Sequence, residues 1–161
     1  MKSRFVLFLI CVCMIAGSAA AFSQQVYPVQ GPLAAQTPPP VLTAKFSGTR
    51  SGKVSLVQAS GESFHGTWEF VTPPFVNAKT PGTAASYPPQ PNLAFAWDAV
   101  YGQGYYISSI LGSENVGQAT VTGDKGTVLQ IEFHREQLGV PEDNHFGVAV
   151  DNRGNIYKVV L

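Results

Sequence analysis

The segment GNIYKVVL, residues 154–161, indicates the fold class of this 161-residue chain. Tyr157, Val159 and Leu161 lie three, five and seven positions after Gly154, and polar and apolar residues alternate between them. Side chains of a β-strand alternate between its two faces, so these three residues share one face. The segment therefore predicts a strand that follows a glycine turn.

The same spacing occurs twice earlier in the chain. GESFHGTW, residues 61–68, places Phe64, Gly66 and Trp68 at the equivalent positions, and GTVLQIEF, residues 126–133, does the same with Leu129, Ile131 and Phe133. A polar turn precedes each segment, and glycine supplies the positive φ that tight hairpins require. An alternating stretch enters each turn, so we predict three hairpins built on one plan, although a β-meander could also produce this recurrence by coincidence.

The remaining pattern completes a mainly β fold. NLAFAWDAVYG places apolar residues at helical spacing and predicts one short helix over 93–101. Residues 105–111 are expected to form a strand, and 44–48 a further one. We predict an antiparallel β-meander of about eight strands that is barrel-like, with the final strand pairing with the first so that neither edge is left open.

The N-terminal residues predict export. Lys2 and Arg4 precede an apolar run, and small residues follow it, which is typical of a signal peptide over 1–23. Cleavage after Ala21 or after Ser23 fits the small-residue rule, and we prefer Ser23. An uncleaved anchor is the alternative, and it would be the chain's one contact with a membrane.

Proline divides the rest of the chain. Five prolines lie within 28–40 and six within 73–91, whereas the alternating stretches contain none. Proline cannot donate to a sheet ladder. We therefore predict a disordered Pro-rich leader at 24–42 and a single β domain at 43–161, interrupted by a Pro-rich insertion at 72–92.

Composition excludes several classes of function. Cys11 and Cys13 lie in the signal segment, so the mature chain has no disulfide and no thiol nucleophile. Removing Lys2 and Arg4 from ten basic residues leaves eight against ten acidic ones. Without a basic cluster we expect no nucleic-acid partner.

Two resemblances add to this interpretation. Residues 52–68, GKVSLVQASGESFHGTW, resemble a MORN repeat, whose units are short hairpins ending in a Gly-x-Trp-like pattern. Val54 departs from that pattern, and the other two units lack its ending, so the resemblance implies hairpin geometry alone. The C-terminal part, from GQATVTGDKGTVLQIEF to GVAVDNRGNIYKVVL, is similar to small exported bacterial proteins of no known activity.

No motif for a catalytic nucleophile, phosphate, dinucleotide or zinc is present, and we predict no enzyme activity and no cofactor. His65 and Glu69 share an outer strand face, as do Glu132 and His134. If those strands were neighbours, the four side chains could form a metal site and support a metal-dependent hydrolase. A solvated sheet face explains the same residues, and we predict no metal.

Aromatic residues provide the candidate ligand contacts. Trp97, Tyr101 and Tyr105 cluster around the expected helix, where they form either core or a pocket wall. Our leading hypothesis is an exported, non-enzymatic structural or binding domain at the bacterial cell envelope, in the periplasm or outside the cell, with an envelope protein or a small apolar ligand as candidate partners. The rival is a carrier of a small apolar ligand inside the barrel, lined by Trp68, Phe70, Phe133 and Tyr157.

Overall fold

The computed structural model describes residues 21–59, 61–71, 91–113, 116–135 and 145–160. Residues 1–20 of the expected signal peptide and residues 72–90 of the expected insertion lie outside this part. Both assignments therefore remain predictions.

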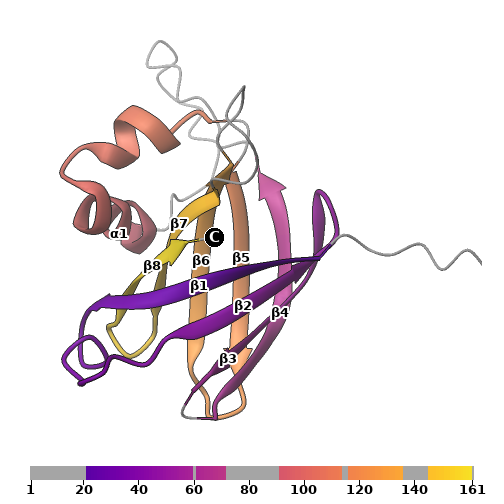
Figure 1. Cartoon of the computed structure of the whole chain (residues 1–161). Coiled ribbons are helices and arrows are strands. Elements are labelled where there is room, and N and C mark those ends of the chain that lie inside the picture. The colour runs from indigo at the N-terminus through magenta and orange to yellow at the C-terminus, as the bar shows by residue number, and fades with distance from the viewer. Residues whose placement is uncertain (1–20, 60, 72–90, 114–115, 136–144, 161) are drawn as a thin grey trace, which may run out of the picture.

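Eight antiparallel strands form a closed barrel in simple chain order (Figure 1). Its last strand pairs with its first, so the predicted β-meander barrel with closure is confirmed. The strands are β1 (Ala21–Gln30), β2 (Leu42–Ser47), β3 (Ser51–Gln58), β4 (Ser63–Val71), β5 (Val116–Gly123), β6 (Val128–Arg135), β7 (His145–Asp151) and β8 (Ile156–Val160).

The first strand corrects the expected leader at 24–42. Residues 24–30 belong to β1, and residues 31–41 connect β1 to β2. The prediction failed because Pro28 is accommodated within β1. The pairing of β1 with β2 ends at Val26, so Pro28 pairs with β8 alone, beside a register shift. Such edge positions tolerate a residue without an N–H group. The signal that outweighs the prolines is the buried alternation of Gln24 and Val26.

A helical segment covers part of the outer wall. The expected helix at 93–101 is present as α1 (Pro91–Tyr101), and Gly102 follows it with a φ of 114°. The strand expected at 105–111 is wrong, because the π-helical turn η1 (Tyr106–Ile110) occupies this segment. Gly102 and Gly104 both have positive φ and reverse the chain, and Asp98 Oδ1 then accepts a hydrogen bond from Tyr106 N at 3.0 Å. These local constraints outweigh the β propensity of the sequence YYISSIL.

The three predicted hairpins share one turn geometry. Gly61, Gly126 and Gly154 have φ values of 88°, 82° and 85°. In each turn, the glycine N–H donates to the carbonyl three residues earlier, at 2.8, 3.1 and 3.3 Å. The residue before each turn donates its N–H to the residue after the glycine, at 2.9, 2.7 and 3.1 Å. The repeat in the sequence is therefore a repeat of backbone structure.

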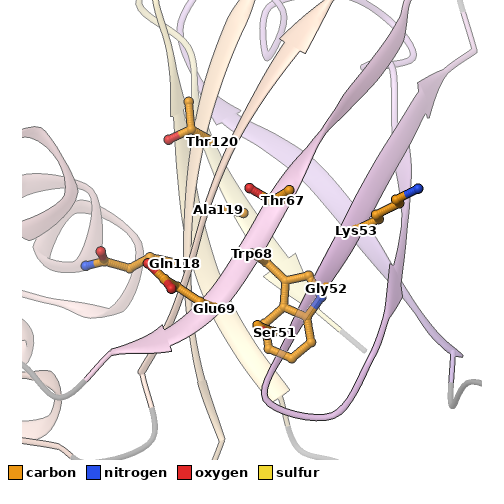
Figure 2. A pocket seen from close by; sticks show the side chains of 9 residues that line it. All are labelled: Ser51, Gly52, Lys53, Thr67, Trp68, Glu69, Gln118, Ala119 and Thr120. Atoms are coloured by element: carbon orange, nitrogen blue, oxygen red, sulfur yellow. The ribbon is translucent and has the colours of Figure 1, made fainter.

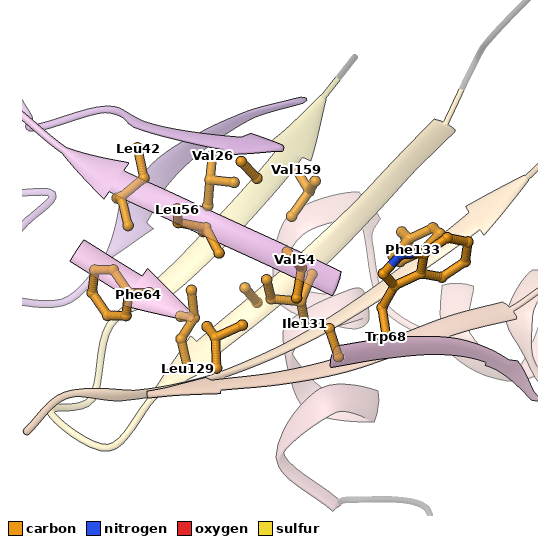
Figure 3. Packing of buried hydrophobic residues seen from close by; sticks show 14 of the residues in the cluster. Val26, Leu42, Val54, Leu56, Phe64, Trp68, Leu129, Ile131, Phe133 and Val159 are labelled. Atoms are coloured by element: carbon orange, nitrogen blue, oxygen red, sulfur yellow. The ribbon is translucent and has the colours of Figure 1, made fainter. Parts of the chain in front are cut away.

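Side chains fill the barrel interior (Figure 3). Phe64, Leu129 and Tyr157, which the hairpin repeat predicted to face inward, are all buried in this core. At the end away from the three turns, the rings of Phe46, Trp68 and Phe133 lie within 5.2–6.0 Å of one another. This aromatic group forms one end of the buried core.

A second apolar cluster lies outside the barrel. Leu93, Ala96 and Trp97 of α1 pack with Val148 and Ile156 on the outer faces of β7 and β8. Figure 1 shows α1 beside these strands. The outer wall is therefore apolar under the helix, whereas the exposed residues of β3 to β5 are mainly polar.

Candidate ligand pocket at the turn end of the barrel

The hairpin repeat places polar side chains at one end of the barrel. Glu62, Thr127 and Asn155 each follow a turn glycine, and their exposed fractions are 4%, 4% and 2%. Gln58 and Asp151 precede their turns and are also buried. Such residues are rarely buried unless they are hydrogen-bonded, so each requires an account of its partners.

Asp151 is fully engaged by its neighbours. Its Oδ1 accepts hydrogen bonds from the backbone N–H groups of Arg153 and Asn155, both at 2.9 Å. Its Oδ2 accepts from Asn155 Nδ2 at 2.8 Å and from the Tyr157 hydroxyl at 2.7 Å. Four donors therefore satisfy this carboxylate, and its role is to fix the β7–β8 turn.

Burial raises the pKa of the Tyr157 hydroxyl well above its usual range, and the hydrogen bond to Asp151 raises it further. The phenol therefore stays protonated at neutral pH and donates to the carboxylate. Tyr157 was predicted as a ligand contact, and it does line the pocket, but its hydroxyl is already paired.

Glu62 and Thr127 are less well satisfied. Glu62 Oε1 accepts one long hydrogen bond from Thr127 N at 3.4 Å, and none of the described residues forms an ion pair with this carboxylate. The Thr127 hydroxyl oxygen is buried, and within the described part of the chain it has no hydrogen-bond partner. Gly123 contributes to this arrangement, because a Cβ at that position would overlap the Glu62 carboxylate.

These groups line a pocket of about 430 Å³, here called the turn-end pocket. The loop 31–41 forms one wall, where Leu33 N donates to Asn155 Oδ1 at 2.9 Å. Leu33 and Phe64 supply apolar surface. Lys125 and Arg153 line the same pocket but are exposed, so the cations lie at the rim and the acids are buried. The volume is within the range of small-molecule sites.

The other predicted contact residues do not form one site. Trp68 and Phe133 lie in the interior, and Trp68 Nε1 donates to Ser47 O at 2.9 Å. Trp97, Tyr101 and Tyr105 lie outside the barrel, with ring centroids 5.0–5.9 Å apart. The sequence left core or pocket open for this group, and its packing into the helix–sheet cluster identifies it as core.

A buried carboxylate underlies the outer aromatic group. Glu132 is 4% exposed and accepts hydrogen bonds from Trp97 Nε1 at 2.7 Å and from Gln118 Nε2 at 3.0 Å. Burial raises the pKa of this carboxyl above its usual value, and the two hydrogen bonds oppose the shift. Glu132 therefore connects α1 to the barrel wall.

The conditional metal site does not assemble. β5 lies between β4 and β6, so Glu69 and Glu132 are separated by Gln118 in register. The His134 ring bonds Ser113 Oγ at 2.6 Å, and His65 is exposed on β4. In the described ranges, no group of three His, Cys, Asp or Glu side chains could hold a metal ion.

A larger groove of about 580 Å³ lies across the outer face of β3, β4 and β5 (Figure 2). Exposed polar side chains such as Lys53, Thr67 and Glu69 line it. Water already solvates exposed polar groups, and no buried polar atom without a partner lines this groove among the described residues. The turn-end pocket is therefore the better candidate.

The sequence signal for this pocket is the residue directly after each turn glycine. It lies on the same strand face as the residues three, five and seven positions after that glycine. Extending the pattern back by two residues reaches Glu62, Thr127 and Asn155. The presence of polar residues at all three positions marks the end of the barrel.

No family model matches this chain, and no curated protein or solved structure gives a significant match to it. The hairpin that the MORN resemblance implies at 52–68 is present as β3 and β4, but membership of that family remains a prediction. Neither helical segment of the described ranges has the length and hydrophobicity that crossing a bilayer requires.

Proposed function

We propose that this chain is an exported, non-enzymatic binding domain that holds a small ligand in the turn-end pocket. The observation that carries this proposal is the pocket's polar floor, where a buried carboxylate lacks a cation and a buried hydroxyl lacks a partner. Burying such groups costs free energy unless a partner satisfies them, so a ligand that supplies donors would recover that cost.

Export and location at the bacterial cell envelope are supported by the signal-like N-terminus and by the absence of cysteine after residue 13. A non-enzymatic role is supported by the separation of His65 and His134 and by the four hydrogen bonds that occupy Asp151. An apolar carrier is the second candidate. The packing of Phe46, Trp68 and Phe133 inside the barrel favours a ligand at the turn end over one in the interior.

A fragment screen by two-dimensional amide NMR tests the proposal. We expect bound fragments to shift the signals of Glu62, Thr127 and Asn155, because these residues form the pocket floor. Gln36→Trp, a change at an exposed pocket residue, should block binding, and Ala35→Trp on the same loop but outside the pocket lining should not. Shifts confined to Trp68 and Phe133, or equal binding by both variants, would refute this assignment of the site.

A further inference from the structure

We infer that the turn-end pocket takes a small zwitterion of the amino-acid type, with its ammonium group at Glu62 and Thr127 and its acid group at the rim. This inference rests on the proposed function and names the chemistry of that site. It follows from which polar groups of the pocket remain unsatisfied and from where the charges lie.

The pocket floor offers acceptors. Asp151 is saturated by four donors, and Asn155 Oδ1 accepts from Leu33 N, so neither needs a ligand. Glu62 accepts one bond of 3.4 Å, and the Thr127 hydroxyl oxygen has no described partner. An ammonium group carries three donors and a positive charge, which matches a carboxylate beside a hydroxyl oxygen.

The pocket rim carries the opposite charge. Lys125 and Arg153 are exposed, and the Arg153 guanidinium donates to Lys125 O at 3.0 Å, which holds the two turns together at the rim. A purely cationic ligand would be repelled by these side chains as it entered. A ligand with a carboxylate at its outer end would instead pair with them, and the floor and the rim would then each face an opposite charge.

The pocket walls set the body of the ligand. Phe64, Leu33 and Pro32 supply apolar surface to the same pocket. A side chain of hydrocarbon or aromatic character would bury against them. The volume of about 430 Å³ suits a molecule of the size of a single amino acid better than a long peptide.

Three related probes test the inference, titrated by calorimetry and amide NMR at pH 7: L-phenylalanine, phenethylamine, which lacks the carboxylate, and 3-phenylpropionate, which lacks the ammonium group. We expect L-phenylalanine to bind most tightly. Glu62→Gln should weaken L-phenylalanine and phenethylamine by about tenfold or more, because a charge-assisted hydrogen bond is lost, and should not weaken 3-phenylpropionate. The matched control is Glu69→Gln, which changes an exposed carboxylate on the outer wall.

A second pair of variants tests the other contacts. Thr127→Val removes the hydroxyl without a change of charge and should weaken the binding of L-phenylalanine and phenethylamine. The double variant Lys125→Gln and Arg153→Gln should weaken the binding of L-phenylalanine and leave the binding of phenethylamine unchanged. Amide spectra and urea unfolding of each variant show whether it retains the fold, so a loss of binding is read only from folded protein.

The failure of this inference is distinguishable from the failure of the proposed function. Equal affinities of the three probes, unchanged binding by Glu62→Gln, or pocket binding of uncharged fragments alone would overturn the zwitterion and leave the pocket as a ligand site. If every probe and fragment still bound to the Gln36→Trp variant, both the zwitterion inference and the proposed function of the turn-end pocket would be overturned.

Discussion

At the scale of single residues, the interior depends on pairing large rings with glycine. Phe133 lies in register between Gly117 of β5 and Gly147 of β7. A Cβ at 117 would overlap the Phe133 ring, and one at 147 would overlap the backbone carbonyl oxygen of Glu132 and approach Phe133 Cα and Cβ at 2.9 Å. These glycines therefore serve packing, in contrast to the turn glycines, whose added Cβ atoms would meet nothing within 4 Å.

Gly117→Ala should lower the free energy of unfolding by about 1–3 kcal/mol, because the added methyl group overlaps the Phe133 ring. Gly117 has no positive φ, so the cost comes from overpacking and not from backbone strain. Urea unfolding measures the change. The same substitution in a Phe133→Leu background should cost distinctly less, since the ring that obstructs the methyl group is gone. An equal cost in both backgrounds would mean that Phe133 is not the obstacle.

At the scale of elements, α1 is attached to the wall by a buried carboxyl group, Glu132. The Trp97 indole and the Gln118 amide both donate to Glu132, and no cation accompanies them among the described contacts of this carboxyl. Because burial raises the pKa of Glu132 above its unfolded value of 4.5, the native state binds a proton that the unfolded chain has released.

The free energy of unfolding of the wild type, measured relative to that of the Glu132→Gln variant, should therefore fall as the pH rises above 4.5. For each unit by which the pKa is raised, about 1.4 kcal/mol is present at lower pH and lost once Glu132 ionises. Urea unfolding of both proteins between pH 4.5 and 8 measures the difference. Glu69→Gln, which changes an exposed acid, should run parallel to the wild type, and a constant difference for Glu132→Gln would contradict the shift.

Sequence reasoning predicted the elements in which local pattern and tertiary packing agree. The three hairpins combine alternation with turn glycines, and α1 combines helical spacing with Gly102. It failed at β1, where proline is tolerated by an edge position, and at η1, where Asp98 and two glycines override strand-forming residues. Of the predicted contact residues, Tyr157 alone lines the turn-end pocket. The other aromatic residues pack into the two apolar clusters, and the sequence does not show which aromatic side chains become core.

At the scale of the whole molecule, closure depends on β1. Val26 is fully buried and pairs with Leu42 of β2 on one side and with Val159 of β8 on the other. The strand therefore joins the two ends of the meander and covers two edges that would otherwise be open to pairing with other chains.

Val26→Asp should destabilise the barrel by at least about 3 kcal/mol, because it buries an unpaired charge at the closing seam. Tyr27→Asp changes the adjacent side chain, which is 42% exposed, and should have little effect. Urea unfolding reports the stability, and size-exclusion chromatography reports any association through opened edges. If residues 24–42 were a flexible leader, both substitutions would be silent.

The repeated turn has a consequence for how this scaffold could change its specificity. One backbone plan delivers Glu62, Thr127 and Asn155 to a shared floor, one side chain from each hairpin, while separate residues build the wall. Replacing Glu62 and Thr127 in combination would therefore change the ligand chemistry, while Asn155 would be kept because it bonds Leu33 N and Asp151. A combinatorial library at these two codons, selected against chemically diverse targets, would turn the domain into a small receptor scaffold.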